Sequence, residues 1–235
     1  VFSSSREVYG DVHRFEGYNE QAADFAYTES TYSASKIAGE AFIYSYARCY
    51  GLPYLVFRFS NVYGRFDNDL QRMVRVIPLF IHSMLRGEPI TIYGGRDKTL
   101  DFTYVDDCVD GIARGIDALA AGRVVNQTIN LAYGQGNTLV HCAERIAEEL
   151  AVDPQMTLAP SLLGEVTHYV ADLSKARELL GYAPQVPLDE GIARAVSWFR
   201  EHRDTHPEEN VPVRADHEGA LGSGAGWKTP VASSS

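Results

Sequence analysis

The sequence is poor in several features that would assign it to a particular class of protein. Its three cysteines, Cys49, Cys108 and Cys142, are far apart and odd in number. Their spacing predicts neither a disulfide framework nor a metal site, and a reducing, cytoplasmic compartment suits them. The seven histidines form no cluster with ligand spacing, so we predict no metal ion. No apolar run approaches the roughly 20 residues that a membrane-spanning helix needs.

Positive charge is also scarce. The 235 residues include 31 acidic and 21 basic side chains, which give a formal net charge of −10. This balance disfavours nucleic acids and anionic membranes as partners, although an acidic protein can still hold an anionic small molecule in a locally basic pocket. With 45% hydrophobic residues, the chain has the composition of one large globular domain or two small ones.

Two further features are missing at the level of motifs. The chain opens with Val-Phe-Ser-Ser-Ser and no initiator methionine, so we expect it to be a fragment of a longer protein. It also lacks a Gly-rich strand–turn–helix fingerprint for a dinucleotide. Gly134-Gln135-Gly136 is the nearest match, but it has no third glycine and no acidic residue about 20 positions later. We predict that this segment is a loop.

Hydrophobic periodicity predicts alternating strands and helices. Predicted strands cover residues 1–3, 54–59, 89–93, 101–105 and 126–132, the third and fourth of them around a Gly94-Gly95 turn. Predicted helices cover residues 30–50, 70–86, 106–120, 138–151, 173–180 and 187–202. Pro78 is expected to kink or break the second helix, Asp106 to cap the third, and Asn137 or Thr138 to cap the fourth. This alternation predicts an α/β fold with a mostly parallel sheet.

The strongest chemical signal is the pair Tyr32 and Lys36. Residues four positions apart on a helix lie on the same face, one turn apart. A phenol titrates near pH 10, and a neighbouring ammonium group lowers its pKa by favouring the phenolate. The pattern alone is common on surface helices. Ser5 strengthens it, because a serine at the end of a buried strand lies where ligands bind in parallel sheets.

Six stretches carry a resemblance to a known family, in order along residues 1 to about 202: residues 2–10, 29–36, 58–64, 75–78, 101–107 and 169–180. Together they resemble the extended short-chain dehydrogenases, which include UDP-glucose 4-epimerases, sugar-nucleotide 4,6-dehydratases and UDP-glucuronate decarboxylases. The resemblance implies an incomplete Rossmann-type, doubly wound parallel sheet with a smaller C-terminal α/β substrate-binding region. It implies that residues 1–64 are the C-terminal part of the NAD-binding Rossmann domain. Residues 65–202 would be mainly the substrate-binding region, with some elements returning to the Rossmann domain. Residues 203–235, rich in Gly, Ser, Pro and charge, are predicted to be a disordered tail.

The resemblance also implies roles for particular residues. Ser5 matches the catalytic Ser or Thr, Tyr32 the catalytic base, and Lys36 its cofactor-binding partner. Phe59 and Ser60 would lie near the nicotinamide of NAD. The implied contacts to a nucleotide-sugar substrate are Ser5, Glu7, Asn61, Val76, Ile77 and Glu165. A homodimer through the helices at 30–50 and 70–86 is implied as well.

The choice among family members depends on Ser5-Arg6-Glu7. In the dehydratases of the family, the motif at these positions looks like Thr-Asp-Glu, in which the Asp acts as the acid and the Glu as the base. Arg6 cannot donate a proton at neutral pH, which weakens the dehydratase interpretation, while Glu7 keeps it open. Ser-Ser-Ser followed by Val-Tyr-Gly resembles the 4-epimerases, so we predict inversion at C4 of a UDP-hexose. A dehydratase, a decarboxylase, a non-catalytic NAD(P)-sensing protein and an inactive fragment are the alternatives.

Two positions depart from the family pattern. Leu100 and Leu162 stand where the family usually has arginines that hold the phosphates or ribose of the nucleotide. Loss of one charge-assisted contact costs about 1.5–3 kcal/mol. We therefore expect weaker diphosphate binding unless Arg75, Arg96 or Lys98 compensates.

Overall fold

The computed structural model describes residues 1–10, 17–22, 28, 30–70, 74–161 and 166–205. Leu162, Glu165 and residues 206–235 of the predicted tail lie outside the described residues. Three parallel strands form the central sheet in the order β1-β2-β7: β1 (Phe2–Ser5), β2 (Leu55–Phe59) and β7 (Gln127–Leu131). The middle strand β2 is almost wholly buried, as expected of a parallel strand that is covered on both faces.

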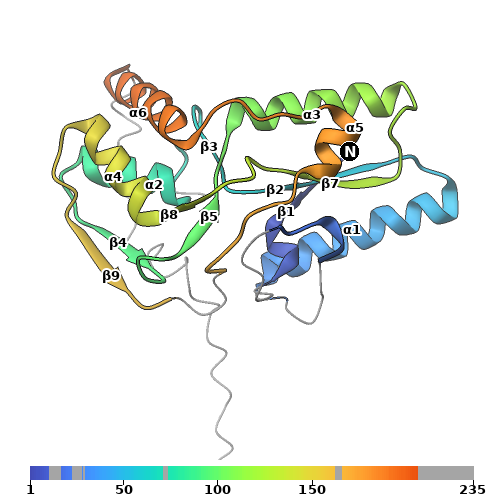
Figure 1. Ribbon diagram of the computed structural model, residues 1–235, viewed down its shortest axis with the longest axis horizontal. Coiled ribbons are helices and arrows are strands. Elements are labelled where there is room, and N and C mark those ends of the chain that lie inside the picture. The colour runs from blue at the N-terminus through green and yellow to red at the C-terminus, as the bar shows by residue number, and fades with distance from the viewer. Residues whose placement is uncertain (11–16, 23–27, 29, 71–73, 162–165, 206–235) are drawn as a thin grey trace, which may run out of the picture.

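Helices cover both faces of this sheet (Figure 1). On one face lies α1 (Thr31–Tyr50), and on the other lie α3 (Val105–Ala120) and α5 (Ser174–Leu180). The packing is close: a Cβ added at Gly39 of α1 would lie 2.3 Å from the Phe2 ring, and one at Gly115 of α3 would lie 2.2 Å from the Phe57 ring. The expected α/β fold with a parallel sheet is confirmed.

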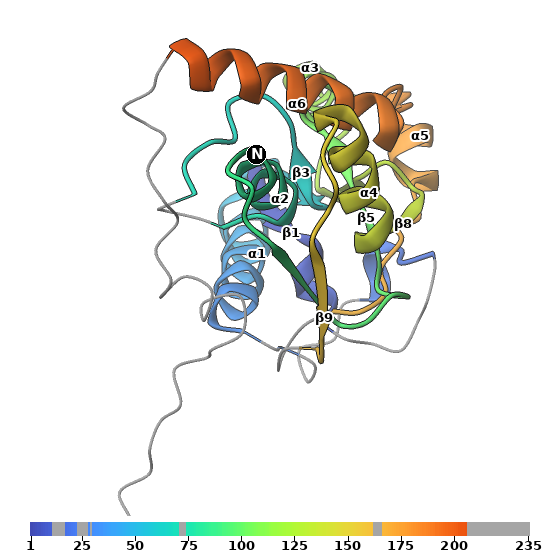
Figure 2. The same cartoon turned by 90° about the vertical axis from the view of Figure 1, so that its left-hand side faces the viewer.

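The rest of the chain forms a second region of small sheets and helices (Figure 2). Its strand pairs are β3 (Val62–Tyr63) with β6 (Thr103–Tyr104), β4 (Ile90–Tyr93) with β9 (Met156–Ala159), and β5 (Thr99–Asp101) with β8 (Gly136–Thr138). Its helices are α2 (Val76–Leu85), α4 (Leu139–Leu150) and α6 (Leu188–Thr205). The strands on either side of Gly94-Gly95 do not pair with each other; β4 pairs with β9 and β5 with β8, each a later segment of the chain. Gly136, predicted as loop, begins β8.

Two predictions about helix starts are wrong for local reasons. The helix predicted from residue 70 begins at Val76, and Pro78 lies in its first turn, where a missing N–H leaves no helical hydrogen bond unmade. Asp106 does not cap α3. The capping position is occupied by Tyr104, whose side chain makes no capping hydrogen bond. Asp106 instead lies in the first turn, where a carboxylate is favourable beside the positive end of the helix dipole. Thr138 caps α4, as predicted, by accepting from the His141 N–H.

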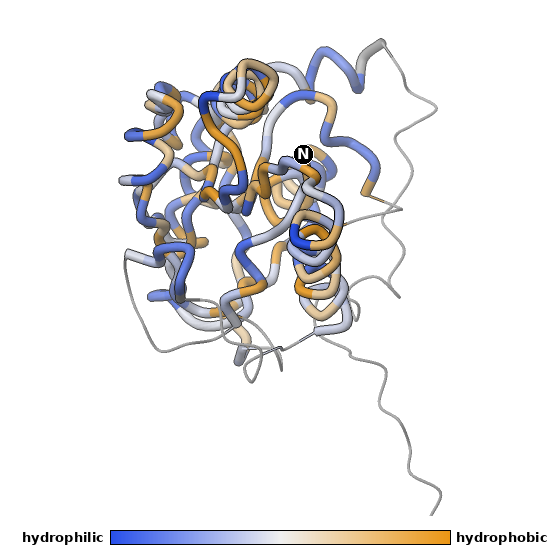
Figure 3. Tube along the Cα trace, turned by 90° about the vertical axis from the view of Figure 1, so that its right-hand side faces the viewer, coloured by the Kyte–Doolittle hydropathy of each residue, from blue (hydrophilic) through white to orange (hydrophobic). Residues whose placement is uncertain are grey.

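The last helix is longer than expected. Helix α6 runs to Thr205 and so includes the first residues of the predicted tail. Phe199 is buried in the core, and Trp198 packs against it. Hydrophilic and hydrophobic residues are mixed along the helices (Figure 3). None of the described helices combines the length and the apolarity that a membrane span requires.

Candidate active site at the carboxyl ends of β1 and β2

The start of α1 places the predicted catalytic pair. Ser30 caps the helix through a reciprocal capping box with Ser33, in which each side chain accepts from the backbone N–H of the other residue. Tyr32 is therefore the second residue of a well-defined helix, and 44% of its surface is exposed. Lys36 follows one turn later, with its Nζ 5.4 Å from the centre of the Tyr32 ring. The predicted one-face arrangement of these two residues is confirmed.

Lys36 also ties α1 to the sheet. Its Nζ donates a 3.0 Å hydrogen bond to the carbonyl oxygen of Ser3 in β1. An ammonium group has three donors, so this bond orients the side chain and leaves donors for a ligand. The bond holds the positive charge beside the exposed Tyr32 ring.

Ser5 and Glu7 lie beside this pair. Ser5 ends β1 and caps the short 3₁₀ helix η1 (Arg6–Tyr9) by accepting from the Glu7 N–H at 3.2 Å. The Glu7 carboxylate in turn accepts a 3.4 Å hydrogen bond from Ser30 Oγ, at the cap of α1. The end of β1 and the start of α1 are thus joined, so that Ser5 and Glu7 lie at the same end of the sheet as Tyr32.

The end of β2 brings a second group of predicted residues. Phe59 is the register partner of Ser5 across the parallel pair. Ser60 is fully buried and donates a 2.6 Å hydrogen bond to the Asp101 carbonyl. Asn61 has a positive φ of 37° and donates to the same carbonyl at 2.9 Å. The Ser60 hydroxyl therefore has a structural partner, and Asn61 is held in a conformation that asparagine tolerates better than most residues.

Asp101 is a buried acid that sequence reasoning did not single out. Its carboxylate accepts hydrogen bonds from the backbone N–H groups of Tyr133, Gly134 and Ala171. Burial raises the pKa of Asp101 to about 6, although these backbone bonds and the charge of Arg6 oppose the rise. The sequence feature that could have identified Asp101 is an acidic residue inside an apolar strand segment. Through the bonds to its carboxylate, Asp101 joins β5 to the loop after β7, while its carbonyl oxygen accepts the hydrogen bond from Asn61.

Arg6 has a place in the site that the sequence did not suggest. Its Nε donates a 3.2 Å hydrogen bond to Asn61 Oδ1, and its guanidinium lies 5.7 Å from the centre of the Tyr169 ring. Its Nη1 is enclosed and has no hydrogen-bond partner within the described structure. The residue that weakened the dehydratase interpretation is thus a cation at the centre of the predicted site.

The remaining predicted residues are buried or lie away from the residues at the ends of β1 and β2. Ile77 is buried in the core and Val76 packs against it, so Ile77 would contact a ligand only through its backbone. Leu100 is also buried, in β5, where its side chain serves packing. Of the cations expected to compensate for it, Arg75 is paired with Asp67 and Lys98 is buried. Glu165 lies outside the described residues.

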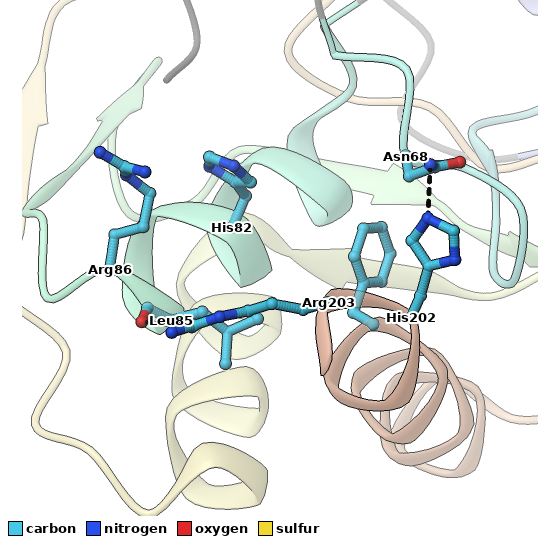
Figure 4. A pocket seen from close by; sticks show the side chains of 7 residues that line it. Asn68, His82, Leu85, Arg86, His202 and Arg203 are labelled. Atoms are coloured by element: carbon cyan, nitrogen blue, oxygen red, sulfur yellow. Dashed lines mark hydrogen bonds between the residues drawn. The ribbon is translucent and has the colours of Figure 1, made fainter. Parts of the chain in front are cut away.

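A separate pocket of about 160 Å³ lies between α2 and α6. His82, Leu85 and Arg86 come from α2 and the residue after it, Phe199, His202 and Arg203 from α6, and Asn68 from the loop before α2 (Figure 4). Arg86 is paired with Glu88 at 2.7 Å, and Arg203 donates to the Leu85 carbonyl at 2.8 Å. None of the predicted site residues lines this pocket. In the described part of the chain, no group of three His, Cys, Asp or Glu side chains is arranged to hold a metal ion.

Comparisons with known proteins identify the family. Residues 1–132 match the model of the NAD dependent epimerase/dehydratase family. A putative UDP-glucose 4-epimerase of Methanocaldococcus jannaschii is 34% identical over 176 residues, which are 75% of this chain and 55% of that protein. A dTDP-glucose 4,6-dehydratase of Haemophilus influenzae is 31% identical over 209 residues, 83% of this chain and 59% of that protein. The chain belongs to the NAD dependent epimerase/dehydratase family.

Solved structures agree with this assignment. The UDP-glucose 4-epimerase of Thermotoga maritima, solved with UDP-glucose, has a TM-score of 0.74 and 30% identity, and the match covers 85% of this chain and 62% of that one. The UDP-glucuronic acid 4-epimerase of Bacillus cereus, solved with UDP-glucuronic acid and NAD, has a TM-score of 0.76 and 26% identity over 85% and 60%. The expected Rossmann-type fold is thereby confirmed. The chain spans about 60% of the length of these relatives.

Proposed function

We propose that the chain is part of an NAD-dependent nucleotide-sugar epimerase that inverts C4 of a UDP-hexose through a 4-keto intermediate. The observation that carries the proposal is the Tyr32–Lys36 pair, which lies one helical turn apart on α1 and is joined to β1, the strand that ends at Ser5, by the hydrogen bond from Lys36 to the Ser3 carbonyl. Ligands bind at this end of open parallel sheets. Membership of the family and likeness to UDP-sugar 4-epimerases support the reaction class.

The residues present fit one part of NAD. Lys36 offers donors to ribose hydroxyls, and Tyr32 is exposed where a nicotinamide and a sugar would meet. The chain has no Gly-rich turn for the pyrophosphate. When bound, NAD would supply the hydride acceptor and donor that oxidation and reduction at C4 require.

The chain's own residues would move the proton. Tyr32, as phenolate, takes the proton of the sugar 4-hydroxyl, and the Lys36 ammonium stabilises the negative charge on the phenolate. Ser5 orients the same hydroxyl. Inversion requires that the 4-keto sugar turns over in the pocket before Tyr32 returns the proton.

A 4,6-dehydratase or a UDP-glucuronate decarboxylase is the second candidate, and Glu7 favours it. The Glu7 carboxylate accepts a hydrogen bond from Ser30 at the cap of α1, two residues before the predicted base Tyr32 in the chain. Likeness to dTDP-glucose 4,6-dehydratases is compatible with this alternative.

An alternative of a different functional class is a protein that binds NAD(P) without catalysing a reaction, or an inactive fragment of an enzyme. The joint presence of Ser5, Tyr32 and Lys36 argues against it, because a binding protein has no use for an activated phenol. Full retention of NMR-detected turnover in Tyr32→Phe would remove this argument.

We also propose that the protein is a homodimer through α1. Phe42, Tyr46 and Tyr50 recur every four residues along this helix and are 67%, 53% and 77% exposed. Helix α2, the other expected contact, has six of its ten residues buried in the core and offers less surface. Sedimentation of the Phe42→Ser/Tyr46→Ser variant tests the proposal: a dimer that persists unchanged would contradict it.

The decisive experiment follows sugar proton NMR spectra during incubation of the full-length gene product with NAD and UDP-, dTDP- or GDP-hexoses. We expect the C4 epimer to appear, and Tyr32→Phe to slow its formation by about 10² to 10⁴-fold. Tyr46→Phe is the matched control, because Tyr46 is an exposed tyrosine of the same helix. A stable 4-keto-6-deoxy product would instead establish the dehydratase and assign catalysis to Glu7.

A further inference from the structure

Arg6 is a cation without an ion-pair partner among the described residues, although its charge acts on the buried Asp101 carboxylate, where it opposes the rise in pKa that burial causes. It is the first residue of η1, directly after Ser5. Within the described residues no carboxylate lies within ion-pair distance of its guanidinium; its one hydrogen bond is from Nε to Asn61 Oδ1. The Nη1 atom is enclosed without a partner.

This arrangement is energetically unfavourable unless something else completes it. A guanidinium group stays charged at any pH at which the protein is folded, so it cannot escape by losing a proton. Buried charges in proteins are normally paired. A charged donor that is left without an acceptor costs more free energy than a neutral donor does. The fold nevertheless fixes Arg6, since Asn61 accepts from Nε at 3.2 Å and the Tyr169 ring lies beneath the guanidinium.

The surroundings of Arg6 indicate what would complete it. Asn61 is held against the Asp101 carbonyl and Ser5 ends β1, so the guanidinium lies among the residues assigned to substrate. Arg6 as a whole is only half-buried, so solvent and ligands can approach the side chain. Arg75, by contrast, is already paired with Asp67.

We propose that Arg6 binds an anionic oxygen of the nucleotide-sugar substrate and thereby sets which substrates the site accepts. The inference rests on the proposed function and adds the group that recognises the charge of the substrate. The oxyanion is a diphosphate oxygen or a carboxylate on the sugar, both of which a planar guanidinium fork binds through paired N–H groups. Asn61 is the positioning residue, because it accepts from Nε and so directs the Nη edge away from itself.

The test is calorimetric titration of the full-length gene product in the presence of NAD, and of its Arg6→Gln variant, with three probes: UDP, UDP-glucose and UDP-glucuronate. We expect Arg6→Gln to weaken binding by about ten- to a hundredfold, as loss of a charge-assisted contact does. Equal losses for all three probes assign the contact to the diphosphate. A loss confined to UDP-glucuronate assigns it to the sugar carboxylate.

Two controls separate this contact from general damage. Arg6→Lys keeps the charge but not the fork and should retain part of the affinity, with an unchanged far-ultraviolet dichroism spectrum showing that both variants fold. Arg114→Gln removes an exposed arginine of α3 that is paired with Asp110, and it should bind all probes like the unchanged chain. If the unchanged chain binds the probes and Arg6→Gln binds them equally well, the role of Arg6 is refuted while the proposed function stands. If the unchanged chain binds none of them, both fail.

Discussion

Arg6 and Arg58 both contact tyrosine rings of one aromatic cluster and have opposite environments. Arg58, in β2, lies 4.9 Å from the centre of the Tyr9 ring, and Arg6 lies 5.7 Å from that of Tyr169. The two tyrosine rings stack on each other with their centres 5.9 Å apart. One aromatic cluster thus separates the two guanidinium groups.

Arg58 has every kind of partner that a buried guanidinium needs. Its Nε and Nη2 donate to the two carboxylate oxygens of Glu40 at 2.9 and 2.7 Å, and its Nη1 donates to the Glu20 carbonyl. Burial acts most strongly on the pKa of Glu40 and would raise it, but the hydrogen bonds and charge of Arg58, together with hydrogen bonds from Ser4 and Tyr44, lower that pKa below its ordinary value. Ser4 and Tyr44 donate to the same carboxylate, so the charge pair joins α1 to β1 and β2.

Arg6 lacks these partners, and the contrast separates a structural charge from a functional one. A satisfied pair such as Arg58–Glu40 fixes elements relative to each other, whereas an unsatisfied donor is available to a ligand. The pocket between α2 and α6 resembles the first case, because Arg86 is paired with Glu88 and Arg203 donates to the Leu85 carbonyl. His82 Nδ1 is unpartnered there, but burial lowers the pKa of His82 and favours its neutral form, which costs less to leave unpaired.

The largest effect is expected from breaking the satisfied pair. Glu40→Gln leaves Arg58 charged and buried without a counter-ion, and we expect it to lower the free energy of unfolding by about 3–5 kcal/mol. Urea unfolding of both chains measures this loss. The double variant Glu40→Met/Arg58→Met should recover part of it, because no unpaired charge remains; equal losses in the single and double variants would contradict the charge argument.

An intermediate effect is expected from Asp101 and depends on pH. The folded pKa of about 6 lies above the ordinary value of 3.8, so the folded state binds the proton more tightly than the unfolded state. This contribution to stability is full below about pH 4 and is lost as the pH rises through about 6, by about 3 kcal/mol in total at 1.36 kcal/mol per pKa unit.

Asp101→Asn provides the comparison for this pH dependence. The amide does not titrate, so the difference in unfolding free energy between the two chains should change between pH 4 and pH 7. A difference that stays constant over this range would show that Asp101 is ionised with an ordinary pKa in the folded protein. The variant will also be less stable at every pH, since an amide replaces one of the two acceptor oxygens.

The smallest change in stability is expected at Arg6. Because its guanidinium has no counter-ion, Arg6→Met should change the free energy of unfolding by less than about 1 kcal/mol, toward greater stability. Urea unfolding beside Glu40→Gln measures the contrast directly. A loss comparable to that of Glu40→Gln would mean that Arg6 is structural, and the two arginines would no longer differ in kind.

Part of this site was predictable because it depends on local spacing. The helix over 30–50, the strand over 54–59 and the pairing of Tyr32 with Lys36 follow from periodicities within a few turns of chain. The motifs around Ser5, Asn61 and Asp101 predicted the family, which the comparisons confirm. The expected roles of Ser5, Glu7, Phe59, Ser60 and Asn61 remain predictions, although the structure gathers these residues at the ends of β1 and β2.

Other features depend on partners far away in the chain. Strand β9 was missed because it has only four residues and none of them is buried, so that its strand structure depends on pairing with β4. The Asp101 carboxylate finds its donors 32 to 70 residues away, and Arg6 meets Asn61 across 55 residues. Sequence by itself determined the central strands, most of the helices and the one-turn spacing of Tyr32 and Lys36, because those depend on helical and strand periods, and its motifs indicated the family. Only the tertiary structure decided which of Arg6 and Arg58 is satisfied, because pairing of a charge depends on which distant groups the fold brings within hydrogen-bond distance.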